Sequence, residues 1–296
     1  MFPQIAAASA AGVGVSRVRL PSGPWVLLLD FLDQRFPGVG RPVWASRMRQ
    51  GKVGDAQGGV LGVDAPFIAG QLVHYYRELP YETPIPFAAA IVFCDEHLLV
   101  ADKPHFLPTL PAGRYVEECL LVRLRRDTGL DQLVPLHRLD RGTAGLVMFS
   151  VNDNSRASYS ALFSARRIVK VYEALAPLLP NAKFPLQRSS RVVAGEPFFR
   201  MAEVEGAANA QTSIELIEAQ GDIGRYRLRP LTGRKHQLRL HMAALGMPIL
   251  NDRWYPQLLA EAEDDYARPL KLLARALSFI DPVTSESRTF ESQLHL

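Results

Sequence analysis

A single carboxylate stands between two arginines in a segment suited to catalysis. Asp140 lies between Arg138 and Arg141 in a Gly-containing turn, and the apolar run 146–149 that follows is predicted to be a buried strand. A catalytic acid is well placed on a loop that a rigid element anchors. The flanking guanidinium groups would favour the ionised carboxylate and could donate to phosphates. The alternative interpretation is a solvated surface Asp–Arg pair, because charged turn residues usually face water.

A tyrosine in a predicted strand is the second candidate. Within the strand expected at 168–175, the two-residue period puts Lys170 and Tyr172 on the same face. A rigid element would therefore hold both side chains. The alternative is a half-buried tyrosine of the sheet that takes no part in chemistry.

Three arginines alternate with other residues in the strand expected at 224–229. The side chains of Arg225, Arg227 and Arg229 would project from one face and form a basic stripe suited to a phosphate backbone. A solvated sheet face accounts for the same pattern, and the residues alone do not separate the two interpretations.

A predicted helix at 234–245 follows the turn formed by Thr232 and Gly233. Its first residue would be Arg234, at a terminus whose backbone amides favour nearby negative charge. Leu238 would lie on the apolar face of this helix.

Three strings in these segments resemble the RluA-type pseudouridine synthases. The string 137–149 carries the family's H-R-L-D-x-x-T-S/A-G-L pattern, 170–174 carries Lys-x-Tyr-x-Ala, and 232–239 carries Thr-Gly-Arg-x-His-Gln-Leu-Arg. The resemblance covers residues 88–296 closely and residues 25–78 in part.

This resemblance implies isomerisation of uridine to pseudouridine in structured RNA, without cofactor or metal. It implies that Asp140 is the essential aspartate, that Tyr172 stacks on the base and removes the C5 proton, and that Arg234 pairs with Asp140. Whether Asp140 attacks C1′ or takes the 2′ proton stays open, since both roles need an ionised carboxylate. The substrate would be 23S-type ribosomal RNA or transfer RNA.

The resemblance also assigns contacts with RNA. It implies that Arg138 helps to hold the target nucleotide out of its stack and that Leu238 packs against the base. For Arg138 the alternative is a structural arginine bonded to a main-chain carbonyl. Arg141, Lys170 and the basic stripe complete the expected contacts.

Two other functions remain as alternatives. A catalytically silent RNA-binding or ribosome-assembly protein would be free to lose Asp140, Tyr172 or Arg234, yet all three are present. A hydrolase that uses Asp140 as a lone general base would lack a second carboxylate or a metal set.

Composition sets the broad class. The 296 residues are 48% hydrophobic and 22% charged, with a net charge of +4, which permits nucleic-acid binding without requiring it. Cys94 and Cys119 are not in CxxC spacing, and His236 and His241 are five apart, so we expect no disulfide or metal site and a cytoplasmic location. The chain has no apolar run of about 18 residues, so we expect no membrane span. We expect a monomer.

The predicted fold class is α+β. The family implies one long, mostly antiparallel sheet with flanking helices and a central cleft. We expect a flexible tail at 1–15, a small S4-like domain at 16–78, a Pro-rich linker at 79–87 and the catalytic domain at 88–296. The S4 pattern is partial, because Gly54-Asp55-Ala56 stands where Val-Asn-Gly is usual, and a docking domain without RNA contact is the alternative.

The remaining elements are expected from periodicity and turn residues. Predicted helices lie at 25–36, 43–50, 118–126 and 155–163, and predicted strands at 52–53, 72–76, 91–93, 98–101 and 212–218, with an exposed polar excursion at 177–206.

Overall fold

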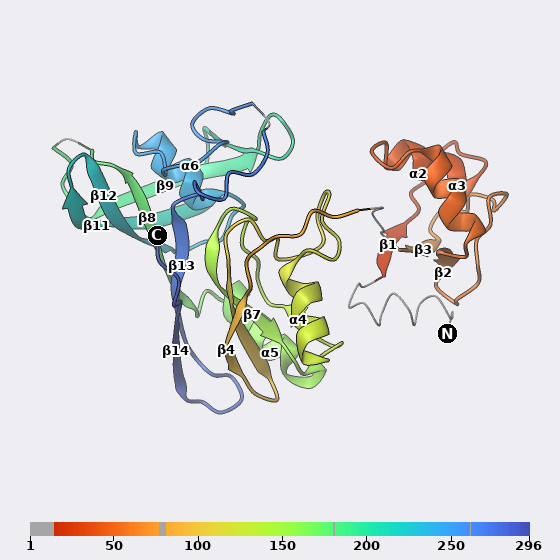
Figure 1. The fold of residues 1–296 in the computed structure, drawn as a ribbon, viewed down its shortest axis with the longest axis horizontal. Coiled ribbons are helices and arrows are strands. Elements are labelled where there is room, and N and C mark those ends of the chain that lie inside the picture. Colours follow the sequence, from red (N-terminus) through yellow and green to blue (C-terminus); the bar gives the residue numbers. More distant parts are fainter. Residues whose placement is uncertain (1–14, 77–80, 180, 261) are drawn as a thin grey trace. The chain divides into compact units, whose positions relative to one another are not determined.

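The computed structural model describes residues 15–76, 81–179, 181–260 and 262–296, and the chain divides into two compact units (Figure 1). The first unit comprises Met1–Thr83, Pro111–Glu117 and Val122–Asp131; the second comprises Pro84–Leu110, Glu118–Leu121 and Gln132–Leu296. Segments 111–117 and 122–131 lie within the predicted catalytic domain but group with the first unit. The expected tail, except for residue 15, and residues 79–80 of the expected linker lie outside the described residues.

The first unit combines two short helices with a three-stranded sheet. Its elements are β1 (Ser16–Arg19), α2 (Leu28–Arg35), α3 (Arg41–Arg49), β2 (Val53–Asp55) and β3 (Leu72–Tyr75). The strands pair antiparallel in the order β1-β3-β2. The predicted helices and the strands β2 and β3 are confirmed, whereas β1 was not predicted.

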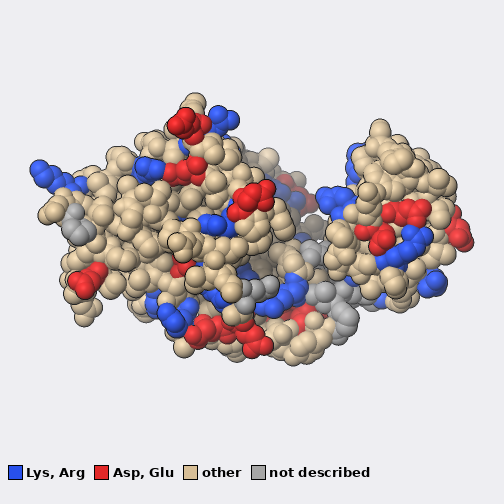
Figure 2. Space-filling model, turned by 90° about the horizontal axis from the view of Figure 1, so that it is seen from above, with Lys and Arg blue, Asp and Glu red and all other residues tan. Residues whose placement is uncertain are grey.

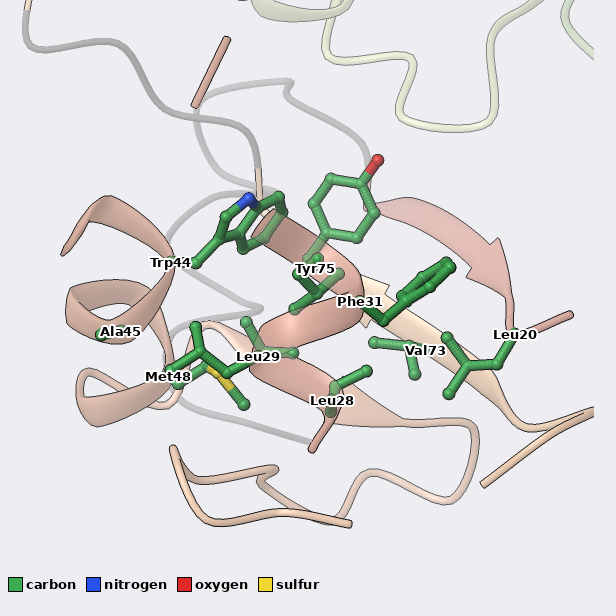
Figure 3. Packing of buried hydrophobic residues seen from close by; sticks show 11 residues of the cluster. Leu20, Leu28, Leu29, Phe31, Trp44, Ala45, Met48, Val73 and Tyr75 are labelled. Carbon is green, nitrogen blue, oxygen red and sulfur yellow. The ribbon is translucent and has the colours of Figure 1, made fainter. Parts of the chain in front are cut away.

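The core of this unit forms where the two helices cover the sheet (Figure 3). Helix α2 buries Leu28, Phe31 and Leu32, the spacing that places side chains on one helical face. Helix α3 contributes Trp44, which is fully buried, and Met48. The core is thus built mainly from residues close together in sequence.

The second unit is built on one large sheet. Its elements are β4 (Ala90–Cys94), β5 (Leu98–Lys103), α4 (Leu120–Thr128, shared with the first unit), β6 (Val134–Pro135), β7 (Ala144–Ser150), α5 (Asp153–Ser164), β8 (Val169–Pro177), β9 (Leu186–Ala194), β10 (Met201–Val204), β11 (Ala210–Gln220), β12 (Ile223–Pro230), α6 (Gln237–Ala244), β13 (Leu272–Ile280) and β14 (Ser287–Glu291).

This sheet has 11 strands, with the order β10-β9-β11-β12-β8-β13-β7-β5-β4, while β14 pairs with β13 and β6 with β7. All pairs are antiparallel except β13 with β7. The predicted α+β class and mostly antiparallel sheet are confirmed.

The exposed polar excursion predicted at residues 177–206 is wrong. They contain β9 and β10, which continue the sheet beyond β11. Strand β9 reads LQRSSRVVA, and one buried residue, Val192, interrupts its otherwise exposed or half-exposed pattern. Such a strand lacks the apolar alternation from which strands are recognised, and its pairing with β11 holds it in place instead.

Helices α5 and α6 pack against different strands of the large sheet (Figure 1). Helix α6 packs Leu238 and Met242 onto β8, β11 and β12, where Tyr226 and Leu228 are fully buried. Helix α5 packs Tyr159 onto β5, β7 and β13. The loop after α5 and the loop before α6 therefore approach the sheet from fixed positions.

The junction of β7 and β13 depends on a glycine. Gly145 has φ +109°, and a Cβ there would lie 2.3 Å from the carbonyl oxygen of Ala274. A side chain at this position would separate the two strands, which pair here in parallel through Ala274 and Gly145. This glycine thereby fixes the strand that leaves the Asp140 turn against the rest of the sheet.

Candidate active site

A pocket of about 160 Å³ lies where the Asp140 turn meets β8 and the start of α6. Six predicted site residues line it: Arg138, Asp140, Lys170, Tyr172, Arg234 and Leu238. Ligand pockets for drug-sized molecules are usually larger, at about 300–1,000 Å³. The pocket suits a group the size of one nucleobase better than an extended ligand.

The turn that carries Asp140 is held by Lys103, the last residue of β5, and by Thr109 in the segment that follows. The hydroxyl of Thr109 donates to the carbonyl of Leu139 at 2.9 Å and accepts from the amide of the same residue at 3.1 Å. The ammonium of Lys103 donates to the carbonyl of Arg141 at 3.3 Å. Bonds on both sides of Asp140 therefore fix its backbone.

Lys103 is fully buried and was not singled out as a site residue from the sequence. Its ammonium also donates to the carbonyls of Pro104 at 3.0 Å and Leu107 at 2.7 Å. Burial lowers the pKa of Lys103 to about 7, although the nearby charge of Asp140 acts in the opposite direction. Three carbonyls require three N–H donors, which only the charged ammonium supplies.

The arginine that pairs with Asp140 is Arg239, and the predicted Arg234–Asp140 pair is wrong. A terminal nitrogen of Arg239 lies 3.5 Å from the Asp140 carboxylate. Arg239 also donates two hydrogen bonds of 2.7 Å to Asp252. Arg234 instead points its Nε to the carbonyl of Asn209 at 3.3 Å and is exposed.

A left-handed residue explains the error. Helix α6 begins at Gln237 and not at Arg234, because His236 has φ +55° and cannot continue a helix. The inward-facing arginine of the string is consequently the one at 239. A signal existed in the sequence: Arg239 lies between Leu238 and Leu240, and a buried arginine needs a carboxylate partner.

His236 is the second group beside Asp140 that sequence analysis missed. Its Nε2 lies 3.7 Å from the Asp140 carboxylate, and its Nδ1 shares a 2.9 Å hydrogen bond with the hydroxyl of Tyr255. Burial lowers the pKa of His236 to about 4, and the charge of Asp140 only partly opposes this. The ring is therefore neutral at pH 7 and adds no positive charge beside Asp140. Its Nε2 carries the proton, and can donate it to the carboxylate, only in the tautomer whose Nδ1 accepts from the Tyr255 hydroxyl.

Tyr172 and Lys170 lie on β8, on the wall of the pocket, as their shared strand face predicted. Burial and the charge of Asp140 both raise the pKa of Tyr172, so its phenol stays protonated. Lys170 donates to the carbonyl of Thr232 at 3.0 Å, and burial lowers its pKa. Lys170 thus ties β8 to the turn before α6.

Arg138 and Leu238 occupy other parts of the pocket wall. Arg138 is exposed, and in the described part of the chain no side-chain hydrogen bond or ion pair holds it. Leu238 is buried at the start of α6. The structural alternative for Arg138, a bond to a main-chain carbonyl, is not what the structure shows.

Arg141 does not line the pocket. Its guanidinium pairs with Asp264 and lies 5.8 Å from the ring centre of Phe106. The side chain therefore joins the Asp140 turn to the segment around residue 264. Its predicted contact with RNA stays a prediction.

The three arginines of β12 lie on the other face of the sheet. Buried Tyr226 and Leu228 alternate with them and point toward α6. The arginines form ion pairs with two glutamates: Arg225 with Glu173 at 2.9 Å, Arg227 with Glu215 at 3.2 Å, and Arg229 with Glu215. Figure 2 likewise shows basic and acidic side chains next to each other on the visible face. The stripe is thus not part of the pocket, and its role in RNA binding stays a prediction.

His137 bonds to the backbone of β7. Its Nε2 accepts a hydrogen bond of 3.0 Å from the amide of Met148, and burial lowers its pKa to about 3. The described residues contain no group of three or more His, Cys, Asp or Glu side chains that could hold a metal ion. Within the same residues, every helix is too short or too polar to cross a bilayer.

Comparison with known proteins defines the class. Residues 97–244 match the family described as RNA pseudouridylate synthase. The chain is 32% identical over 226 residues to the dual-specificity RNA pseudouridine synthase RluA of Escherichia coli K12, covering 72% of this chain and 96% of that protein. It is 30% identical over 233 residues to an uncharacterized RNA pseudouridine synthase of Synechocystis, covering 77% and 79% of the two chains.

Solved structures share the fold. The human RNA pseudouridylate synthase domain containing 1 superposes with a TM-score of 0.58 at 22% identity, covering 72% of this chain and 86% of that one. The human domain containing 4 protein gives 0.54 at 23% identity, covering 69% and 88%.

The chain belongs to the RNA pseudouridine synthase family. Within that family it is of the RluA type, an enzyme that isomerises uridine to pseudouridine in RNA.

Proposed function

We propose that the pocket around Asp140 is the site of uridine isomerisation, and that the substrate is a ribosomal or transfer RNA. The observation that supports this most is the pairing of Asp140 with Arg239 in a pocket for one base. The bacterial relative RluA carries the name dual-specificity RNA pseudouridine synthase, which motivates testing both RNA classes.

Asp140 acts on the sugar of the target uridine. Cleavage of the C1′–N1 bond can begin with attack of the carboxylate on C1′, or with removal of the 2′ proton to give a glycal. Both routes use the ionised carboxylate that Arg239 faces. The uracil then rotates, and C5 bonds to C1′. On the attack route the Asp140–C1′ bond breaks in this step and frees the carboxylate, and on the glycal route Asp140 returns the proton to C2′. The C5 proton leaves last.

The walls of the pocket hold the base. Tyr172 on β8 offers a ring for stacking, and Leu238 on α6 offers an apolar surface. Because its phenol is protonated, Tyr172 must first lose that proton before it can accept the C5 proton. Arg138, exposed at the pocket wall, would pair with a phosphate of the flipped nucleotide and help to offset the few kcal/mol that base flipping costs.

The first unit is proposed to be an S4-like module that binds the substrate RNA. Its two helices and three strands are elements of that pattern, and α3 carries exposed Arg41 and Arg49. The catalytic unit would then select the uridine. We further propose that the protein acts in the cytoplasm, as a monomer, without cofactor or metal.

Release of tritium from C5-labelled uridine RNA tests the reaction. Ribosomal and transfer RNA from cells lacking the protein are the substrates. We expect release with the wild-type chain and none with Asp140→Ala. Asp222→Ala, at the exposed turn between β11 and β12, is the matched control and should keep full activity.

Each alternative has its own outcome. A chain that binds RNA and releases no tritium from either RNA class would be a silent binding protein. Free uracil as the product would indicate a hydrolase. Release that persists in Asp140→Ala would refute the role of the carboxylate.

A further inference from the structure

A series of aromatic rings runs from the pocket to the tip of the hairpin that joins β9 and β10. The ring of His236, which lines the pocket, lies 5.0 Å from that of Trp254. Trp254 lies 5.1 Å from Phe199, and Phe199 lies 5.6 Å from Phe198. We call these four residues the aromatic series. It connects the catalytic site to solvent through rings in contact.

The outermost ring is exposed in a defined turn. Phe198 is 85% exposed, more than any other large hydrophobic residue in the described part of the chain. Its turn is closed by hydrogen bonds from the amide of Gly195 to the carbonyl of Arg200 at 3.1 Å and from the amide of Arg200 to the carbonyl of Pro197 at 2.8 Å. Water disfavours an exposed phenyl ring, and this backbone holds the ring there.

A cation is fixed next to the series. Arg200 donates to the carbonyl of Pro256 at 3.0 Å and lies 4.9 Å from the ring centre of Tyr255. Its Nε is buried and has no hydrogen-bond partner among the described residues. Glu196 lies on the same side, where it lines a cavity of about 300 Å³ with Arg200. Arg200 thus carries positive charge in the same turn as Phe198, at a cavity that Glu203 lines as well.

We propose that the aromatic series binds an unpaired nucleotide that flanks the target uridine, with its base stacked on Phe198 and its phosphate near Arg200. The proposal rests on the RNA substrate of the enzyme. An extruded uridine leaves its neighbours partly unstacked, and aromatic side chains stack on such bases whatever their sequence. The rings extend without a break from the pocket, which favours RNA over a protein partner. The RNA strand whose uridine enters the pocket must continue along a surface next to it.

A double-mutant cycle, with one change in the protein and one in the RNA, tests the contact between Phe198 and the flanking base. The probe is a stem–loop RNA taken from the ribosomal or transfer RNA that the wild-type chain binds. Its loop holds an unpaired uridine, and an abasic residue is placed at one position flanking that uridine at a time. Binding is measured by fluorescence anisotropy for the full-length chain. We expect Phe198→Ala to weaken binding about tenfold, because one base-stacking contact contributes about 1–3 kcal/mol.

At one flanking position, the abasic residue should weaken binding of the wild-type chain as much as Phe198→Ala weakens binding of the intact RNA. The same abasic residue should not weaken RNA binding by Phe198→Ala any further. Phe198→Trp should retain affinity and Phe198→Leu should not, because leucine is apolar but offers no ring. Val204→Ala, which removes another exposed apolar side chain from β10, is the control and should bind like wild type.

Several results would overturn the proposal. They are wild-type affinity in Phe198→Ala, an abasic effect that is as large in Phe198→Ala as in wild type, and full affinity in Phe198→Leu, which would indicate an apolar docking surface for a protein. Pseudouridine formation with excess enzyme is measured separately. If wild type formed none while the stacking cycle held, the enzyme assignment would fail and the nucleotide site would stand.

Discussion

Replacing Arg239 tests whether Arg239 pairs with Asp140, as in the structure, or whether Arg234 does, as the sequence predicted. The side chains of Arg239 and Asp252 are 7% and 1% exposed, and two hydrogen bonds of 2.7 Å join them. Arg239→Met leaves Asp252 as a buried carboxylate without its counter-charge. Breaking a buried pair from one side costs about 3–5 kcal/mol. The corresponding change at exposed Arg234 should stay within about 0.5 kcal/mol.

A double-mutant cycle assigns this cost to the pair. Asp252→Asn keeps an oxygen for the amides of Trp254 and Tyr255, which donate to it at 2.9 and 3.2 Å. Adding it to Arg239→Met should therefore cost less than the sum of the single changes, by about 1–3 kcal/mol. Free energies of unfolding come from urea titrations followed by circular dichroism.

Turnover gives the second readout. Arg239→Met also removes the cation that lies 3.5 Å from Asp140, so single-turnover rates on bound RNA should fall about 10²-fold while RNA affinity changes little. Arg234→Ala should retain most of its rate. If Arg234→Ala lost more turnover than Arg239→Met, or if Arg239→Met were as stable as wild type, the pairing of Arg239 with Asp140 and Asp252 would be refuted.

Two further predictions concern stability. Burial lowers the pKa of His241 to about 4, below the ordinary value of about 6.5, so the unfolded chain binds more protons between these values and stability falls as pH decreases from 6.5 toward 4. His241→Gln should reduce the slope of the free energy of unfolding against pH by the equivalent of up to one proton, measured by urea titrations at several pH values. An unchanged slope would contradict the lowered pKa of His241. Gly145→Ala should cost more than about 2 kcal/mol, because the added Cβ meets the backbone of Ala274, whereas Gly142→Ala, which meets the side chain of Leu270 at 3.3 Å, should cost less. Equal midpoints of thermal unfolding would refute this difference.

The sequence by itself determined the chemistry and much of the element order. The family strings are local, and they identified Asp140, Tyr172 and Lys170, which the structure brings to one pocket. Apolar periodicity likewise located the helices and most strands, since alternation and helical spacing are set by neighbours in the chain.

Only the tertiary structure decided which arginine faces the carboxylate and where the polar strands pair. Arg234 and Arg239 belong to one string, and the left-handed backbone at His236 selects between them. Strand β9 carries little apolar pattern, so its place depends on hydrogen bonds to β11. Arg239 meets Asp140 and β9 meets β11 only in the folded chain, and a local pattern does not encode contacts between separate segments.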